Sequence, residues 1–120
     1  MLKLNTVMIN SEDPKALSEF YAKVLGKAAW ENGPYVGFEA GGSFLMIGPH
    51  SDVKGRNEMP GRIMLNFETA DVKGEFTRIK GLGVSVVQEP YSPSEERDMT
   101  LATFEDPDGN LFQLVTPMTE

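Results

Sequence analysis

Residues 106–115 read DPDGNLFQLV, a turn sequence that leads directly into an apolar run with a glutamine at position 113. Asp-Pro and Asp-Gly pairs favour tight turns, and the run that follows has the length and composition of a strand. An earlier stretch, GGSFLMI at residues 41–47, has the same order of glycine turn and apolar strand. The two stretches predict that the chain is built from two similar halves, each ending in a hairpin strand.

The first half predicts one strand, one helix and three further strands. Asp13 and Pro14 mark the start of the helix, because Asp caps the first turn and Pro suits the first helical position. The expected core face of this helix consists of Leu17, Phe20, Tyr21 and Val24, and Gly26 ends the helix. The expected strands are residues 2–9, 27–31, 35–40 and 43–47, with Gly41 and Gly42 forming the hairpin turn.

The second half predicts the same order of elements. Asp71 is the expected N-cap, Val72, Phe76 and Ile79 form the core face of the helix, and Gly81 and Gly83 end it. The expected strands are residues 62–68, 84–88, 99–104 and 111–115. The run GPHSDVKGRNEMPG between the halves has no periodicity and is typical of a loop.

The halves can be superposed along their length. Thr6–Asp13 lies over Met64–Asp71, and Gly41–Ile47 lies over Asp108–Leu114. We therefore predict a single domain with an α+β fold, made of two βαβββ modules at about residues 2–48 and 62–117 and a linker at about residues 49–61. The alternative is a chance similarity of short apolar strands.

Composition excludes several classes of function. The 120 residues include no cysteine, so thiol catalysis and a disulfide framework are excluded, and a cytoplasmic location is expected. The single histidine and the lack of a GxSxG sequence leave little support for a Ser-His-Asp triad. The net charge of -7 and the scattered Lys and Arg residues argue against a nucleic-acid partner. No run of apolar residues is long enough to predict a membrane helix.

The features that carry a family resemblance are the paired βαβββ halves, EDPKALSEFYAKVLGK at residues 12–27 and FEDPDGNLFQLVTP at residues 104–117. With these features the chain resembles the vicinal oxygen chelate superfamily. That group contains glyoxalase I, bleomycin-resistance proteins, fosfomycin-resistance enzymes, methylmalonyl-CoA epimerase and extradiol dioxygenases. The resemblance implies mixed sheets that curl around a pocket, with helices on the opposite face and often a second subunit, so a homodimer is expected. It does not select one activity, because function depends on the site and not on the fold.

The resemblance also implies where a metal would bind. Metal-dependent members place four ligands, usually His, Glu or Gln, at positions that correspond to Thr6, Met46, Met64 and Gln113. Only Gln113 is a convincing ligand, because thioethers are soft donors and a neutral hydroxyl is a poor one. No metal or other cofactor is therefore expected, and a divalent ion is disfavoured. His50 lies in the linker and is more typical of a surface residue than of a ligand.

A small-molecule ligand is the expected partner. Strand alternation, applied to the positions implied by the resemblance, gives a set of candidate ligand-binding residues: Thr6, Met8, Phe44, Met46, Met64, Asn66 and Gln113. Glu68 follows on the same face and is the one candidate catalytic base. The alternative is that Met8, Phe44, Met46 and Met64 are ordinary core. Asn66 and Glu68 argue against a dry core, since buried polar groups are costly unless they are paired, but they also suit a solvated sheet face.

Two further residues have both a functional and a structural interpretation. Trp30 could stack on a flat ligand, or pack in the core or at a subunit interface. Arg97 could close over an anionic ligand, or be an exposed charge.

Two functions remain. The first is the binding or sequestration of a small organic ligand in a Met-rich pocket without chemistry, as in the bleomycin-resistance proteins that the chain resembles. The second is an enzyme of the lyase, isomerase or dioxygenase type, either metal-free through Glu68 or with an unusual metal site. A purely structural or regulatory dimer is a third interpretation.

Overall fold

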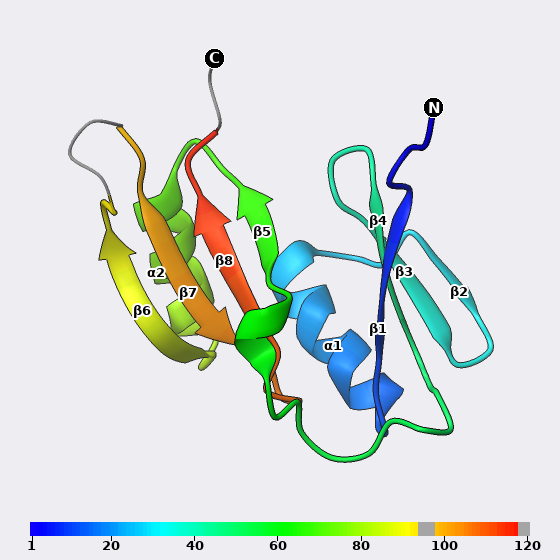
Figure 1. The fold of residues 1–120 in the computed structure, drawn as a ribbon. Coiled ribbons are helices and arrows are strands. Elements are labelled where there is room, and N and C mark those ends of the chain that lie inside the picture. Colours follow the sequence, from blue (N-terminus) through cyan, green and yellow to red (C-terminus); the bar gives the residue numbers. More distant parts are fainter. Residues whose placement is uncertain (94–97, 118–120) are drawn as a thin grey trace. The chain divides into compact units, whose positions relative to one another are not determined.

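The structure, a computed structural model, describes residues 1–93 and 98–117. The chain divides into two compact units, residues 1–56 and residues 57–120. Each unit contains one main helix and a four-stranded mixed sheet (Figure 1). The predicted α+β fold with two βαβββ modules is confirmed. Arg97, a predicted candidate, lies outside the described residues.

The first unit contains β1 (Thr6–Asn10), α1 (Pro14–Leu25), β2 (Trp30–Asn32), β3 (Tyr35–Glu39) and β4 (Phe44–Gly48). The strand order is β1-β4-β3-β2, in which β1 and β4 are parallel and the other pairs are antiparallel. The β3–β4 hairpin turns at Gly41 and Gly42, whose φ angles are 64° and 99°. Positive φ at both central residues is characteristic of the hairpin turn that the Gly-Gly pair predicts.

The core of the first unit lies between α1 and one face of its sheet. The side chain of Asp13 caps α1 by accepting a hydrogen bond from the backbone N–H of Ala16 at 3.2 Å. The buried residues of this core are Leu17, Tyr21, Val24, Phe38, Leu45 and Ile47. Phe20, predicted to be buried, is only half-buried. Tyr21 takes the central position instead, and the ring of Phe20 packs edge-on against it with centroids 5.0 Å apart.

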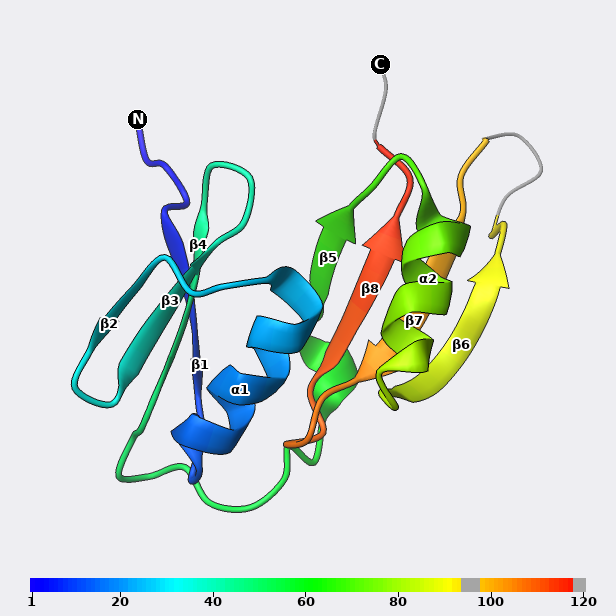
Figure 2. The ribbon, with the colours of Figure 1, turned by 180° about the vertical axis from the view of Figure 1, so that it is seen from behind.

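The second unit contains a short 3-10 turn (Pro60–Arg62), β5 (Leu65–Glu68), α2 (Val72–Gly81), β6 (Ser85–Tyr91), β7 (Leu101–Glu105) and β8 (Leu111–Val115). Its strand order, β5-β8-β7-β6, repeats that of the first unit, with β5 and β8 parallel. Figure 2 shows α2 lying across one face of this sheet. Phe104 is stacked between Phe76 of α2 and Phe112 of β8, with centroid separations of 5.2 and 5.4 Å.

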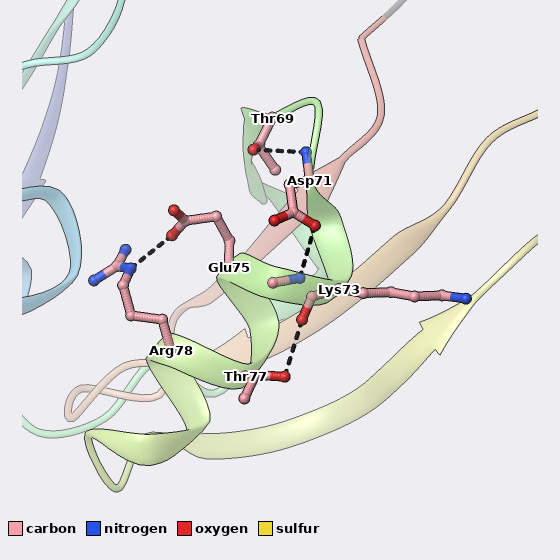
Figure 3. Close-up of polar contacts among 7 residues, drawn as sticks. Thr69, Asp71, Lys73, Glu75, Thr77 and Arg78 are labelled. Carbon is pink, nitrogen blue, oxygen red and sulfur yellow. Dashed lines mark hydrogen bonds and ion pairs between the residues drawn. The ribbon is translucent and has the colours of Figure 1, made fainter.

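The start of α2 is held by side-chain hydrogen bonds (Figure 3). Asp71 Oδ1 accepts from the backbone N–H of Gly74 at 2.9 Å, and Thr69 Oγ1 accepts from the backbone N–H of Asp71 at 3.2 Å. One turn further on, Arg78 Nε donates to Glu75 Oε2 at 2.7 Å. The contacts made by Asp71 Oδ1 and Thr69 Oγ1 satisfy backbone N–H groups at the helix start, which have no intrahelical partner.

Several predicted strands are longer than the observed ones. The strand predicted for residues 27–31, for example, is observed only at Trp30–Asn32. The strand predicted for residues 2–9 begins at Thr6, because its partner β4 begins at Phe44, opposite Thr6. Leu2 and Leu4 precede this ladder and are 98% and 72% exposed. The strand predicted for residues 62–68 begins at Leu65, because Pro60–Arg62 forms the 3-10 turn. Met64 therefore lies just before a strand and not within it.

In the described part of the chain, neither helix combines the length and the apolar character needed to cross a bilayer.

Candidate functional site

Four of the predicted site residues share one sheet face of the first unit. Thr6 is paired with Phe44, and Met8 is paired with Met46. Because residues two apart on a strand point to the same side, all four side chains lie on the face opposite the one that packs Leu45 and Ile47 against α1.

The pairing continues across the whole sheet. Met46 is opposite Gly37 on β3, and Gly37 is opposite Trp30 on β2. Met8, Met46, Gly37 and Trp30 therefore form one row across all four strands, which we call the apolar row. Met8 is 49% exposed and Trp30 is 38% exposed. The alternative prediction is that the methionines are ordinary core. Met8 is too exposed to be a core residue, and Met46 is half-buried.

Two aromatic rings lie against glycines on this face. A Cβ atom added to Gly37 would stand 2.6 Å from Trp30 Nε1, closer than real contacts allow. A Cβ atom added to Gly48 would similarly overlap the ring of Tyr35. Trp30 was among the sequence candidates, whereas Tyr35 was missed. The signal was available in the turn at Gly33 and Pro34, since a two-residue turn pairs Asn32 with Tyr35 and hence Trp30 with Gly37.

The equivalent face of the second unit is polar. Asn66 is paired with Gln113, Gln113 with Thr103, and Thr103 with Gln88, and we call these four residues the polar row. Gln113 Nε2 donates a hydrogen bond to Thr103 Oγ1 at 2.9 Å. The side chain of Gln113 is half-buried and Thr103 is only 5% exposed, so the pair is held within the sheet surface.

Sequence reasoning identified Asn66 and Gln113 but missed Thr103 and Gln88. The signal for Thr103 was the DPDGN turn, because a hairpin closed by residues 105 and 111 places residue 103 opposite residue 113. Gln88 could not be found in this way, because the β6–β7 pairing contains a register shift on each side of it.

Met64 and Glu68 are less closely associated with the polar row. Met64 is half-buried just before β5. Glu68 is the last residue of β5, two residues after Asn66 on the same face and opposite Val115, and it is exposed.

The four positions that the resemblance implies for metal ligands carry side chains that do not fit a hard divalent ion. Met46 and Met64 offer thioethers, and the Thr6 hydroxyl donates to Asn5 Oδ1 at 2.6 Å. The side-chain N–H of Gln113 donates a hydrogen bond to Thr103 Oγ1. Imidazole and carboxylate donors, which such ions prefer, are missing from the set.

The remaining acidic and histidine side chains do not supply a substitute. Within residues 1–93 and 98–117, no three or more His, Asp or Glu side chains come together as a metal site requires. His50 is exposed, and its Nδ1 accepts a hydrogen bond from the backbone N–H of Asp52 at 3.1 Å.

The first unit also has a cleft of about 320 Å³ on its other side, between α1 and strands β2 and β3. Ser18, Glu19, Lys27, Glu31, Val36 and Phe38 contribute to its lining. Trp30 is the one member of the apolar row that borders it.

Comparison with known proteins assigns the family. The model of the glyoxalase-like domain matches residues 6–115. The chain belongs to the glyoxalase-like family. It is thereby a member of the vicinal oxygen chelate superfamily, as the sequence motifs predict.

Similar proteins support this assignment at the level of fold and family. The chain is 28% identical to "Uncharacterized protein YetH" of Bacillus subtilis over 123 residues, covering 93% of this chain and 96% of that protein. A glyoxalase/bleomycin resistance protein/dioxygenase family enzyme from Burkholderia phytofirmans superposes with a TM-score of 0.76 at 21% identity, covering 98% of this chain and all (100%) of that one. Lactoylglutathione lyase from Agrobacterium tumefaciens superposes with a TM-score of 0.72 at 21% identity, covering 95% and 92%. These two structures share the fold of this glyoxalase-like chain.

Proposed function

We propose that this glyoxalase-like protein binds and sequesters a small planar organic ligand on the sheet face that carries the apolar row. The observation that supports the proposal is the alignment of Met8, Met46 and Trp30 across four strands, with the indole ring lying on Gly37. Phe44 and Tyr35 widen the same apolar face. Of the other predicted residues, Thr6 is proposed to supply a polar contact at the β1 edge of this face. Met64, Asn66 and Gln113 are proposed to contact a ligand on the equivalent face of the second unit.

The chemistry of these side chains suits a flat ligand. An aromatic ring that lies on a glycine presents its opposite face for stacking, and aromatic pairs in offset or edge contact contribute about 0.5–1.5 kcal/mol beyond area burial. Methionine side chains adapt to irregular shapes, and small-molecule sites are mostly apolar with few orienting polar atoms. The net charge of -7 favours a cationic ligand over an anionic one.

Sequestration is preferred to metal-dependent chemistry because the four donor positions do not fit a divalent ion. Glu68-dependent catalysis, the alternative predicted from the sequence, requires that a bound compound be converted. Sequestration requires that it be recovered unchanged. Chromatography of the ligand after prolonged incubation with the protein and with Glu68→Gln distinguishes the two.

Trp30 is the only tryptophan, so its fluorescence reports directly on the apolar row. We expect proflavine, a planar cation, to quench Trp30 saturably, and spermidine, a flexible cation, to leave the emission unchanged. Truncation of a residue at the centre of a binding surface commonly costs more than about 1 kcal/mol, so Met8→Ala and Met46→Ala should each weaken proflavine binding at least about fivefold.

Met59→Ala is the matched control, because Met59 is 62% exposed and lies outside the row. It should leave the dissociation constant unchanged. If Met8→Ala and Met46→Ala bind proflavine as tightly as the parent protein, or if spermidine displaces proflavine at equal charge concentration, the binding site is not the apolar row.

The homodimer predicted from the resemblance remains a separate proposal. A symmetric copy would cover apolar side chains that one chain leaves exposed. Sedimentation at micromolar protein concentration tests it, and a single monomeric species would contradict it.

A further inference from the structure

The orientation of the Gln113 amide group is set by its neighbour in the sheet. Gln113 Nε2 donates to Thr103 Oγ1 at 2.9 Å, and Thr103 is almost fully buried, with 5% of its surface exposed. A buried hydroxyl on a strand has little freedom to move, so it keeps the amide group of Gln113 on the β7 side of β8, with Nε2 facing Thr103 in this structure. The carbonyl oxygen Oε1 is then the atom that Gln113 offers to other partners, and it makes no hydrogen bond within the described residues.

Asn66 lies next to Gln113 on the other side, in the parallel strand β5. Neighbouring strands are about 4.8 Å apart, so the two amide side chains can contact the same small group. Asn66 is exposed, and its side chain likewise makes no hydrogen bond within the described part of the chain. In this structure the pair therefore offers one acceptor, Gln113 Oε1, beside an amide that supplies both a donor and an acceptor.

Apolar side chains flank this pair on the same face. Leu111 and Val115 lie two residues before and after Gln113 on β8, and Val115 is paired with Leu101 of β7. All three are half-buried. A ligand group bound at Asn66 and Gln113 would therefore be attached to an apolar body that contacts these side chains.

We propose that Asn66 and Gln113 bind a carboxamide or lactam group of the ligand, and that Thr103 is the residue that positions Gln113 for this role. The inference rests on the proposed small-molecule binding function and specifies the chemical group that is recognised. An amide group has an N–H to donate to Gln113 Oε1 and a carbonyl oxygen to accept from Asn66 Nδ2. A carboxylate has only acceptor oxygens, so its lone pairs would face those of Gln113 Oε1.

Benzamide and benzoate are the probes, because they share a ring and differ in the group that is to be recognised. In ¹⁵N-labelled protein, benzamide should shift the side-chain NH₂ resonances of Asn66 and Gln113 saturably, whereas benzoate at the same concentrations should leave them in place. Thr103→Val removes the acceptor of the positioning hydrogen bond at almost constant shape. Since one hydrogen bond contributes about 0.5–1.5 kcal/mol, this variant should bind benzamide about two- to thirteenfold more weakly.

Thr103→Ser restores the hydroxyl and should restore both the benzamide affinity and the preference over benzoate. A purely structural role for Thr103 would change the unfolding midpoint of Thr103→Val without changing the ratio of benzamide to benzoate affinity. The proposal is overturned if that ratio is the same in Thr103→Val as in the parent protein, or if benzoate shifts the two NH₂ resonances as benzamide does.

The outcome can be separated from a failure of the proposed function. If proflavine quenches Trp30 as expected while benzamide leaves Asn66 and Gln113 unshifted, the amide site is wrong and the apolar row stands. If benzamide shifts the two resonances and proflavine fails to quench Trp30, the amide site stands and the apolar row is wrong.

Discussion

The indole ring of Trp30 lies on the backbone of Gly37, its partner on the neighbouring strand, with Nε1 only 2.6 Å from the position that a Cβ atom would occupy. Glycine normally weakens a strand, because it has no side chain to pack and loses more chain entropy than other residues. Here its missing side chain leaves the space that the ring occupies. Tyr35 and Gly48 repeat the arrangement on the same face.

Gly37→Ala should therefore displace Trp30. Overpacking of this kind typically costs about 1–3 kcal/mol, and the free energy of unfolding in urea should fall accordingly. The emission maximum of Trp30 should move to longer wavelength as the ring becomes more hydrated. Gly61→Ala is the control, since the space around its added Cβ is open. It should leave the emission maximum unchanged and should not lower the free energy of unfolding. An unshifted emission maximum in Gly37→Ala would show that the ring does not depend on Gly37.

A second close approach occurs at the start of α2. A Cβ atom added to Gly74 would overlap the Asp71 carboxylate that caps the helix. Replacing glycine by alanine in a compatible helical position stabilises a protein by about 0.4–1 kcal/mol, and losing a cap costs about 1 kcal/mol. We expect the two effects to offset each other in Gly74→Ala, whereas Gly81→Ala, with open space around it, should stabilise the protein.

The coupling can be measured directly. In a protein that already carries Asp71→Ala, the carboxylate is gone, and Gly74→Ala should then show its full stabilisation in thermal unfolding. Equal effects of Gly74→Ala with and without Asp71 would mean that the cap and the glycine act independently.

The ion pair on the same helix should contribute little. Arg78 Nε and Glu75 Oε2 are 2.7 Å apart, but the two side chains are 46% and 39% exposed. Exposed pairs three residues apart on a helix contribute about 0.2–0.5 kcal/mol, and salt screens them. Glu75→Gln should therefore lower the free energy of unfolding by no more than this amount in dilute buffer, and by less in molar sodium chloride. A larger loss that persists in high salt would indicate a role for Glu75 beyond the pair.

Local signals in the sequence were sufficient for most of the fold. Asp13 and Asp71 cap helices where predicted, and the Gly41-Gly42 turn adopts the expected positive φ angles. These features depend on a few neighbouring residues, so they can be read without knowing the tertiary structure. Strand ends depend on a partner, which explains why β1 begins at Thr6 and not at Leu2.

The candidate site was only partly predictable for the same reason. Alternation placed Thr6, Met8, Phe44 and Met46 on one face, but the pairing of Thr6 with Phe44 and of Met8 with Met46 required the register between distant strands. The contact between Gln113 and Thr103 required the hairpin register and also a side-chain orientation, which alternation does not give. Met64 was predicted to lie in a strand because residues 62–68 have the composition of one. In the structure Pro60 begins a 3-10 turn, and the strand starts only at Leu65.

The turn that precedes Gln113 is organised around the buried carboxylate of Asp106, which is 2% exposed. Asp106 Oδ1 accepts from the backbone N–H groups of Asp108 and Asn110, both at 2.9 Å, and Oδ2 accepts from Asn110 Nδ2 at 3.0 Å. Hydrogen bonds to a charged group contribute about 1.5–3 kcal/mol each in favourable cases, and their loss leaves the N–H groups of two half-buried residues without this acceptor.

Asp106→Ala should therefore lower the free energy of unfolding by about 3 kcal/mol or more, measured in urea, since several such bonds are lost at once. Asp106→Asn keeps one side-chain acceptor oxygen, so its free energy of unfolding should fall less than that of Asp106→Ala. Asp108→Ala is the matched control in the same turn. The backbone N–H of Asp108 donates to Asp106 and its carbonyl accepts from the backbone N–H of Asn57, whereas its carboxylate makes no hydrogen bond within the described residues. Because this turn fixes the pairing of Thr103 with Gln113, amide exchange of β7 and β8 should accelerate in Asp106→Ala more than exchange of β3 and β4. If Asp108→Ala is as destabilising as Asp106→Ala, the stability of the hairpin does not depend on the buried carboxylate.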